Sequence, residues 1–153
     1  PDPRYTLATV DLLVAVPLRF APLPLRYQGV VRAQTTRDAL FSQDFFSIGN
    51  RFTVRGFDGE RTLAAERGWL VRNELATPLP LPGHELYAGI DHGEVGGPFA
   101  QNLAGTRLTG AVIGLRGGWR GLLYEGFAGW ALSRPDGFQS KSPNLGFQLL
   151  YQF

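Results

Sequence analysis

The sequence predicts an all-β protein, and more specifically an antiparallel β-barrel that spans a membrane. Apolar and polar residues alternate with period two along most of the chain, while glycine or proline interrupts nearly every window long enough for a helix. Most of the alternating runs reach ten residues or more, and a membrane strand needs about 9–11 residues. Short and long connections also alternate, which is typical of outer-membrane barrels.

Seven strands are predicted from the alternation. They span residues 5–16, 25–36, 67–77, 85–95, 106–116, 122–132 and 145–153. The last strand is the clearest, because Phe147, Leu149, Tyr151 and Phe153 occupy one face and mostly glycine and glutamine occupy the other. We expect the apolar face of each strand to contact lipid.

The connections orient the predicted strands. Short ones are expected at 17–24, 78–83 and 117–121, and long ones at 37–66, 96–106 and 133–144. Because outer-membrane barrels have short periplasmic turns and longer external loops, the short set is assigned to the periplasm. The last strand then runs inward, and Phe153 lies at the periplasmic rim.

Seven strands do not close a bacterial barrel, whose strand number is even and at least eight. An open edge would leave backbone groups unpaired in lipid. We therefore expect further strands upstream of Pro1, with this chain forming the C-terminal part of a larger barrel.

Composition excludes several classes of function. The chain has fifteen Lys and Arg residues and thirteen Asp and Glu residues, and it has no polybasic stretch. A nucleic-acid partner is therefore not expected. The chain has no cysteine, which excludes a disulfide framework and thiolate metal sites. The glycine-rich tract 114–126 lacks the spacing and the following helix of a phosphate-binding loop, so a hairpin turn is the expected structure there.

Two short motifs stand out. The connection 37–66 contains Val54-Arg55-Gly56-Phe57, and a predicted strand contains Gly89-Ile90-Asp91-His92-Gly93. Alternation places Asp91 on the polar face of its strand, where a carboxylate needs a partner or water. Arg55 beside Gly56 could bind that carboxylate bidentately. An exposed arginine in a turn and an aspartate solvated in a watery pore remain the alternative.

Together with Phe46-Ser47-Ile48-Gly49, Glu66-Arg67-Gly68-Trp69, Arg72-Asn73-Glu74-Leu75 and the terminal Tyr151-Gln152-Phe153, these motifs resemble the C-terminal barrel of two-partner secretion transporters. The resemblance is greatest to the branch that contains the filamentous-haemagglutinin transporter, in the superfamily that also includes BamA-type insertases. It implies strands ten to sixteen of a sixteen-stranded barrel, with Val54, Arg55, Gly56 and Phe57 at the tip of a loop folded into the lumen. It also implies that Arg55 pairs with Asp91, within the second motif of Gly89, Asp91 and Gly93.

The resemblance further implies a pore in the bacterial outer membrane that exports a large partner protein of the haemagglutinin or haemolysin type. The partner would cross unfolded from periplasm to cell surface, without nucleotide hydrolysis and without a cofactor. Membrane lipid, lipopolysaccharide and the barrel-assembly machinery are the other expected partners, the last recognising the strand that ends at Phe153. The periplasmic POTRA domains of such transporters are absent from this chain.

Three other functions compete with export. An enzyme would need Asp91 and His92 to share a site, but strand neighbours point to opposite faces, and neither a catalytic nor a metal-binding motif occurs. A passive porin and a BamA-type insertase remain open, because both could carry a long loop inside a barrel. The number of POTRA domains in the full-length protein would separate the insertase from the secretion transporter.

Overall fold

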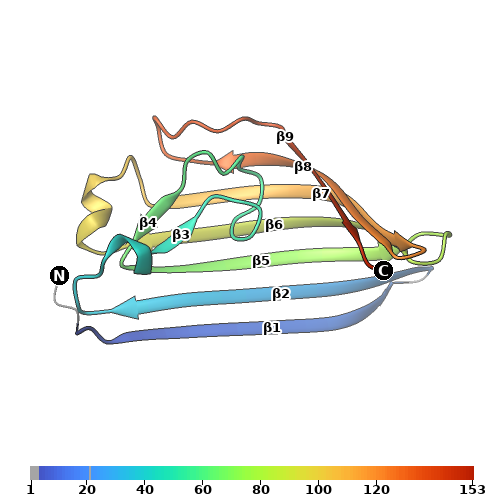
Figure 1. The fold of residues 1–153 in the computed structure, drawn as a ribbon, viewed down its shortest axis with the longest axis horizontal. Coiled ribbons are helices and arrows are strands. Elements are labelled where there is room, and N and C mark those ends of the chain that lie inside the picture. The colour runs from blue at the N-terminus through green and yellow to red at the C-terminus, as the bar shows by residue number, and fades with distance from the viewer. Residues whose placement is uncertain (1–3, 21) are drawn as a thin grey trace.

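The computed structural model describes residues 4–20 and 22–153, and within them the chain forms one large antiparallel sheet and a small two-stranded one (Figure 1). The seven strands of the large sheet lie in the order β1-β2-β5-β6-β7-β8-β9. They are β1 (Leu7–Phe20), β2 (Leu23–Thr36), β5 (Arg67–Pro78), β6 (His84–Gly96), β7 (Arg107–Trp119), β8 (Leu122–Ser133) and β9 (Asn144–Tyr151). The predicted all-β antiparallel fold is confirmed. In the described part of the chain, no helix is long and apolar enough to cross a membrane.

Most strands are longer than the sequence predicts, because the expected turns are partly strand. Pro17 pairs with Arg26, so β1 continues to Phe20, which is possible for proline at the edge of the described sheet. Trp119 still belongs to β7, and only Arg120 and Gly121 form the turn to β8. Both turn residues have positive φ angles of 47° and 82°, which suits a two-residue hairpin.

The last strand is shorter than the predicted range 145–153. Tyr151 pairs with Leu122, the first residue of β8, so the two residues that follow have no partner on that strand. Phe153 consequently lies beyond the paired part of β9 and is fully exposed.

The long connection 37–66 is more ordered than a plain loop. It contains the 3₁₀ turn η1 (Ser42–Asp44) and the short strands β3 (Phe46–Ile48) and β4 (Leu63–Ala65), which pair with each other. The shorter connection between β6 and β7 contains the 3₁₀ helix η2 (Pro98–Asn102). Figure 1 shows that the segment between β3 and β4 folds back over one face of the large sheet.

We call this side the loop-bearing face. The hydrophobic core lies here, between the long connection and the sheet; its buried members are Ile48, Val54, Phe57, Leu63, Ala65, Leu70, Val95, Leu108 and Phe138. We also distinguish the turn end of the sheet, at residues 79–83 and 120–121, from the loop end, at 37–66, 97–106 and 134–143.

The opposite face is apolar and exposed. Strand alternation places on it Trp69, Leu75, Leu86, Ile90, Ile113, Leu115, Trp119, Trp130, Leu145, Phe147, Leu149 and Tyr151, each more than a third exposed. A continuous apolar face of this kind is not typical of a soluble monomer, since such proteins rarely expose large apolar patches. It will be called the apolar face.

Candidate functional site

The tip of the long connection is a compact turn that presents Arg55 to the sheet. The amide of Thr53 donates to the carbonyl of Asn50 at 3.1 Å, and the Thr53 hydroxyl accepts from the amide of Gly49 at 3.0 Å. Gly49 and Gly56 have φ angles of 118° and 105°, a region that favours glycine. The turn therefore depends on the glycine that follows Arg55 in the motif.

Arg55 forms a dense set of hydrogen bonds with Asp91 on β6. Its backbone amide and its Nε donate to Asp91 Oδ2 at 3.0 and 2.7 Å, and its Nη2 donates to Oδ1 at 2.8 Å. Asp91 is completely buried and Arg55 is 7% exposed. One carboxylate therefore holds both the backbone and the guanidinium of the tip residue, in the bidentate geometry that only arginine offers.

A second carboxylate, Glu74 on β5, completes the site. Arg55 Nη1 donates to Glu74 Oε1 at 2.7 Å, while Arg116 Nη2 on β7 donates to Glu74 Oε2 at 2.6 Å. Burial on its own lowers the pKa of Arg55, but the hydrogen bonds and negative charges of Asp91 and Glu74 raise it above its ordinary value. Arg55 thus stays protonated between two buried anions, each of which would be costly if left unpaired.

Inward glycines form the floor beneath the tip. A Cβ added at Gly110 on β7 would overlap the carbonyl oxygen of Arg55, and one at Gly129 on β8 would lie 2.9 Å from the Cα of Gly56. A Cβ at Gly89 would lie 2.7 Å from Arg55 Nη2, and one at Gly93 would lie 2.9 Å from a Val54 methyl group. Glycine within a strand often marks such a close backbone approach.

The segment is also fastened on both sides of the tip. The amide of Lys141 donates to Asp58 Oδ2 at 2.7 Å, and the amide of Asp58 donates to the Ser140 hydroxyl at 3.0 Å. On the other side, Arg51 Nη2 donates to Gln148 of β9 at 2.6 Å. The connection between β8 and β9, and β9 itself, are therefore tied to the long connection.

These contacts lower the pKa of the Asp58 carboxyl group. Burial on its own raises the pKa of its carboxyl group, but the amides of Lys141 and Glu60, the Ser140 hydroxyl and the charge of Lys141 together bring it below its ordinary value. The fastening is consequently made by the ionised form of Asp58.

The structure brings seven of the sequence-predicted residues together and separates four. Val54, Arg55, Gly56 and Phe57 meet Gly89, Asp91 and Gly93 on the loop-bearing face. Phe147, Leu149 and Tyr151 lie on the apolar face of β9, and Phe153 follows them. Sequence reasoning did not single out Gly110 or Gly129, and it named Glu74 only within the motif Arg72-Asn73-Glu74-Leu75, without a role as partner of Arg55. A polar-face carboxylate in a predicted strand was the available signal for Glu74, and strand alternation relative to Asp91 was the signal for the glycines.

The arrangement is suited to holding a segment of chain. His92 points away from Asp91 toward the apolar face, where its Nδ1 lies 2.6 Å from the Thr109 hydroxyl and its ring packs on Trp69. Among residues 4–20 and 22–153, no three His, Cys, Asp or Glu side chains gather as they would around a metal ion. The contacts that Arg55 makes with Asp91 and Glu74 are ion pairs between a loop and the face of a sheet.

A family model described as "Haemolysin secretion/activation protein ShlB/FhaC/HecB" matches residues 1–117. The protein "Outer membrane transporter CdiB-2" of Burkholderia pseudomallei (strain 1026b) is 40% identical over 154 residues, which cover 98% of this chain and 26% of that protein.

Two solved structures also match. CdiB from Acinetobacter baumannii superposes with a TM-score of 0.86 at 31% identity, covering 95% of this chain and 27% of that chain. CdiB from Escherichia coli shares the fold, with a TM-score of 0.80 at 21% identity over 95% of this chain and 27% of that chain. The chain therefore spans about a quarter of the length of the relatives it matches.

Proposed function

The chain belongs to the ShlB/FhaC/HecB family of outer-membrane haemolysin secretion/activation proteins, and from this premise we propose that it is part of the wall of a protein-export pore. The pore carries a partner protein of the haemagglutinin or haemolysin type, unfolded, from the periplasm to the cell surface. The chain contributes strands ten to sixteen of a sixteen-stranded barrel whose other strands lie upstream. The POTRA domains that capture the partner also lie upstream.

The contrast between the two faces of the sheet supports a membrane pore. The apolar face carries exposed tryptophan, leucine and isoleucine side chains, as expected for contact with lipid. The loop-bearing face carries charged side chains on neighbouring strands, among them Arg72, Glu74, Glu85, Asp91 and Arg116. Charges in a membrane protein normally face a water-filled or protein-filled interior.

The seating of Arg55 between Asp91 and Glu74 is the observation that carries the proposal. A long connection held by two buried ion pairs on the polar face occupies part of the lumen, so it can act as a constriction or a guide for the exported chain. A passive porin needs no such fixed basic tip. An insertase could share it, but the Burkholderia pseudomallei relative is named a transporter.

Export by this pore proceeds without nucleotide hydrolysis. The glycine-rich tract 114–126 belongs to the hairpin of β7 and β8, so its amides pair within the sheet instead of facing a phosphate group.

Lipid and lipopolysaccharide contact the apolar face, and the barrel-assembly machinery recognises the aromatic terminal strand during biogenesis.

Two measurements on the full-length protein test this function. In planar bilayers, the purified protein is expected to give single-channel currents, and deletion of residues 49–62 is expected to increase the conductance because the lumen is emptied. In cells that express a matching partner gene, the partner is expected at the cell surface only when the transporter is present. A full-length protein that assembles but exports no partner and conducts no ions would refute the proposal.

A further inference from the structure

An unbroken series of ion pairs crosses the loop-bearing face. In the described part of the chain it runs Arg26–Glu85–Arg116–Glu74–Arg55–Asp91–Arg72, with shortest nitrogen–oxygen distances of 2.5 to 3.7 Å. Four arginines therefore share three carboxylates. Arg55 alone of these comes from the long connection, while the other six lie on strands β2, β5, β6 and β7.

Arg116 and Arg55 share the carboxylate of Glu74. They approach the two oxygens of Glu74 at 2.6 and 2.7 Å, respectively, from opposite directions along the series. Arg116 is held from its other side by Glu85, and its guanidinium lies over the Tyr87 ring at 4.4 Å. Its position is thus fixed by strand residues whether or not the tip is present.

The charge balance depends on where the tip is. With Arg55 seated, the series has one more cation than carboxylates. With Arg55 removed, three arginines face three carboxylates, and Glu74 still has Arg116 as a partner. Release of the tip therefore leaves no carboxylate of the series unpaired, which lowers its free-energy cost.

We propose that Arg116 and Glu85 are positioning residues that set how tightly the loop tip is held, acting through Glu74. Loss of the Arg116 charge leaves Arg55 as the partner of Glu74 in the series, so the tip is held more tightly against the sheet. Loss of the Glu85 charge removes the other ion pair of Arg116, so Arg116 binds Glu74 more strongly and the Glu74–Arg55 ion pair becomes weaker. The tip is then held less tightly. This inference deepens the proposed function, because it assumes that the tip occupies the lumen of a transporter.

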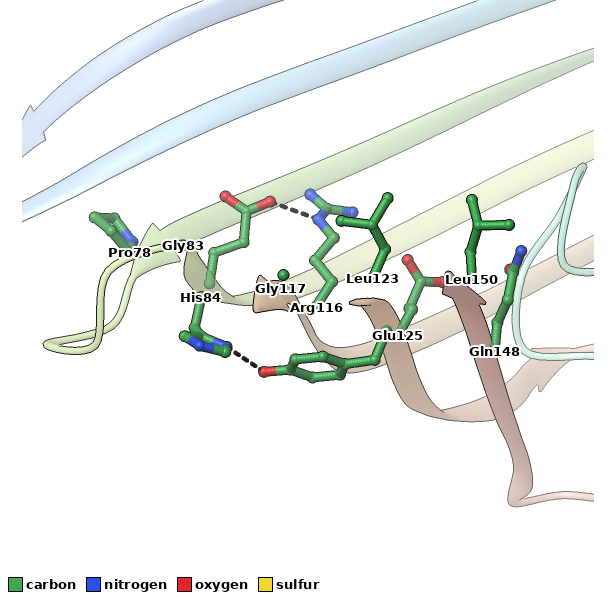
Figure 2. A pocket seen from close by; sticks show the side chains of 12 residues that line it. Pro78, Gly83, His84, Arg116, Gly117, Leu123, Glu125, Gln148 and Leu150 are labelled. Atoms are coloured by element: carbon green, nitrogen blue, oxygen red, sulfur yellow. Dashed lines mark hydrogen bonds and ion pairs between the residues drawn. The ribbon is translucent and has the colours of Figure 1, made fainter. Parts of the chain in front are cut away.

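The turn-end part of the series is accessible. Glu85 and Arg116 line a cavity of about 610 Å³ at the turn end of the sheet and form an ion pair there. Figure 2 shows that Arg116 and His84, which both line this cavity, extend to opposite sides of the strands. His84 Nδ1 and the Tyr124 hydroxyl, 2.5 Å apart, line the same cavity. A change in charge at the turn end can therefore alter how strongly the tip is bound, because Glu85 and Glu74 connect the two through Arg116.

The test is the labelling rate of a buried thiol in the full-length protein in liposomes. Val54 belongs to the tip and is completely buried, so Val54→Cys, in a background without other reactive cysteines, reports tip release to a soluble maleimide. Relative to this parent, Arg116→Gln is expected to slow labelling about fivefold and Glu85→Gln to accelerate it about fivefold, as expected for coupled neighbouring charges. Arg116→Lys keeps the charge and is expected to stay within about twofold of the parent.

Opposite signs at Glu85 and Arg116 are the decisive feature, because simple damage to the wall would accelerate labelling in both variants. Changes in the same direction, or no change in either, would overturn the inference. If Arg116→Gln does not assemble, Arg116→Met keeps an aliphatic stem over Tyr87 and is expected to slow labelling equally. Export by the unsubstituted protein is measured separately; its failure would refute the proposed function, whereas the signs of the labelling changes concern only the control of the tip.

Discussion

Arg55 and Asp91 are 36 residues apart in the sequence, yet three hydrogen bonds of 2.7 to 3.0 Å join them in the structure. The contact fixes the tip of a long connection to the middle of a strand on the polar face of the sheet. Because Asp91 is completely buried, the pair is shielded from water and salt, and it differs in this respect from a surface ion pair.

The glycine floor gives the first prediction. Gly110→Ala places a methyl group where the carbonyl of Arg55 lies, so the tip cannot seat without a backbone shift. Overpacking of this kind typically costs about 1–3 kcal/mol. We expect faster protease cleavage between residues 49 and 62 of the folded full-length protein.

Gly126→Ala is the matched control for that prediction. Its added methyl group would meet only the Phe147 ring at 3.6 Å, an ordinary contact on the opposite face of the sheet. Equal cleavage rates for the Gly110 and Gly126 variants would show that close packing under the tip does not hold the segment.

Asp58 gives a prediction about pH. Because its pKa in the folded protein is below the ordinary value, its stabilisation is fully present above the ordinary carboxyl pKa and is lost as the pH falls through the lowered pKa. Below about pH 4, the amide of Lys141 is therefore expected to lose hydrogen-exchange protection progressively, after correction for intrinsic exchange.

The variant Asp58→Asn separates titration of this residue from general acid effects. It keeps one oxygen acceptor but does not titrate, so its Lys141 amide should be less protected at neutral pH and should respond less to acid. If acid affects the variant and the unsubstituted protein alike, Asp58 does not control the fastening.

The terminal aromatic residue gives a prediction about assembly. Phe153 lies beyond the last paired residue of β9 and its ring stacks near Tyr151, with centroids 6.0 Å apart. Since its exposed side chain contributes little to the described sheet, Phe153→Ala is expected to reduce insertion into the outer membrane more than it reduces folded stability. Heat-modifiability of the membrane fraction measures insertion, with Gln152→Ala as the neighbouring control. Insertion as efficient as in the control would contradict this role.

Much of the sheet could be predicted from the sequence because strand alternation is a local property. The same alternation correctly assigned Asp91 to the polar face and Phe147 to the apolar face. The strand ends were less predictable, since they depend on the partner strand. Pro17 remains in β1 because Arg26 pairs with it, and β9 stops at Tyr151 because β8 begins at Leu122.

The candidate site was predictable only where a motif marked it. Arg55 and Asp91 lie in the two motifs that the resemblance pairs. Glu74 also lies in a motif that carries the resemblance, but it becomes a partner of Arg55 only through the antiparallel register that pairs it with Gly89. Gly110 and Gly129 are two among twenty glycines. Strand alternation assigns them to the polar face, but it does not show which inward glycines lie beneath the tip. Long-range register therefore determines the part of the site that the sequence did not reveal.

A double-mutant cycle on partner export tests the central claim, that Arg55 holds the loop to Asp91 inside the transporter. Arg55→Ala and Asp91→Ala are each expected to depress export by the assembled full-length protein, because each breaks the buried ion pair that joins the tip to β6. The double variant should lose less than the sum of the two single losses, with a coupling of about 1–3 kcal/mol. Strictly additive losses would show that the two residues act independently and would contradict the account.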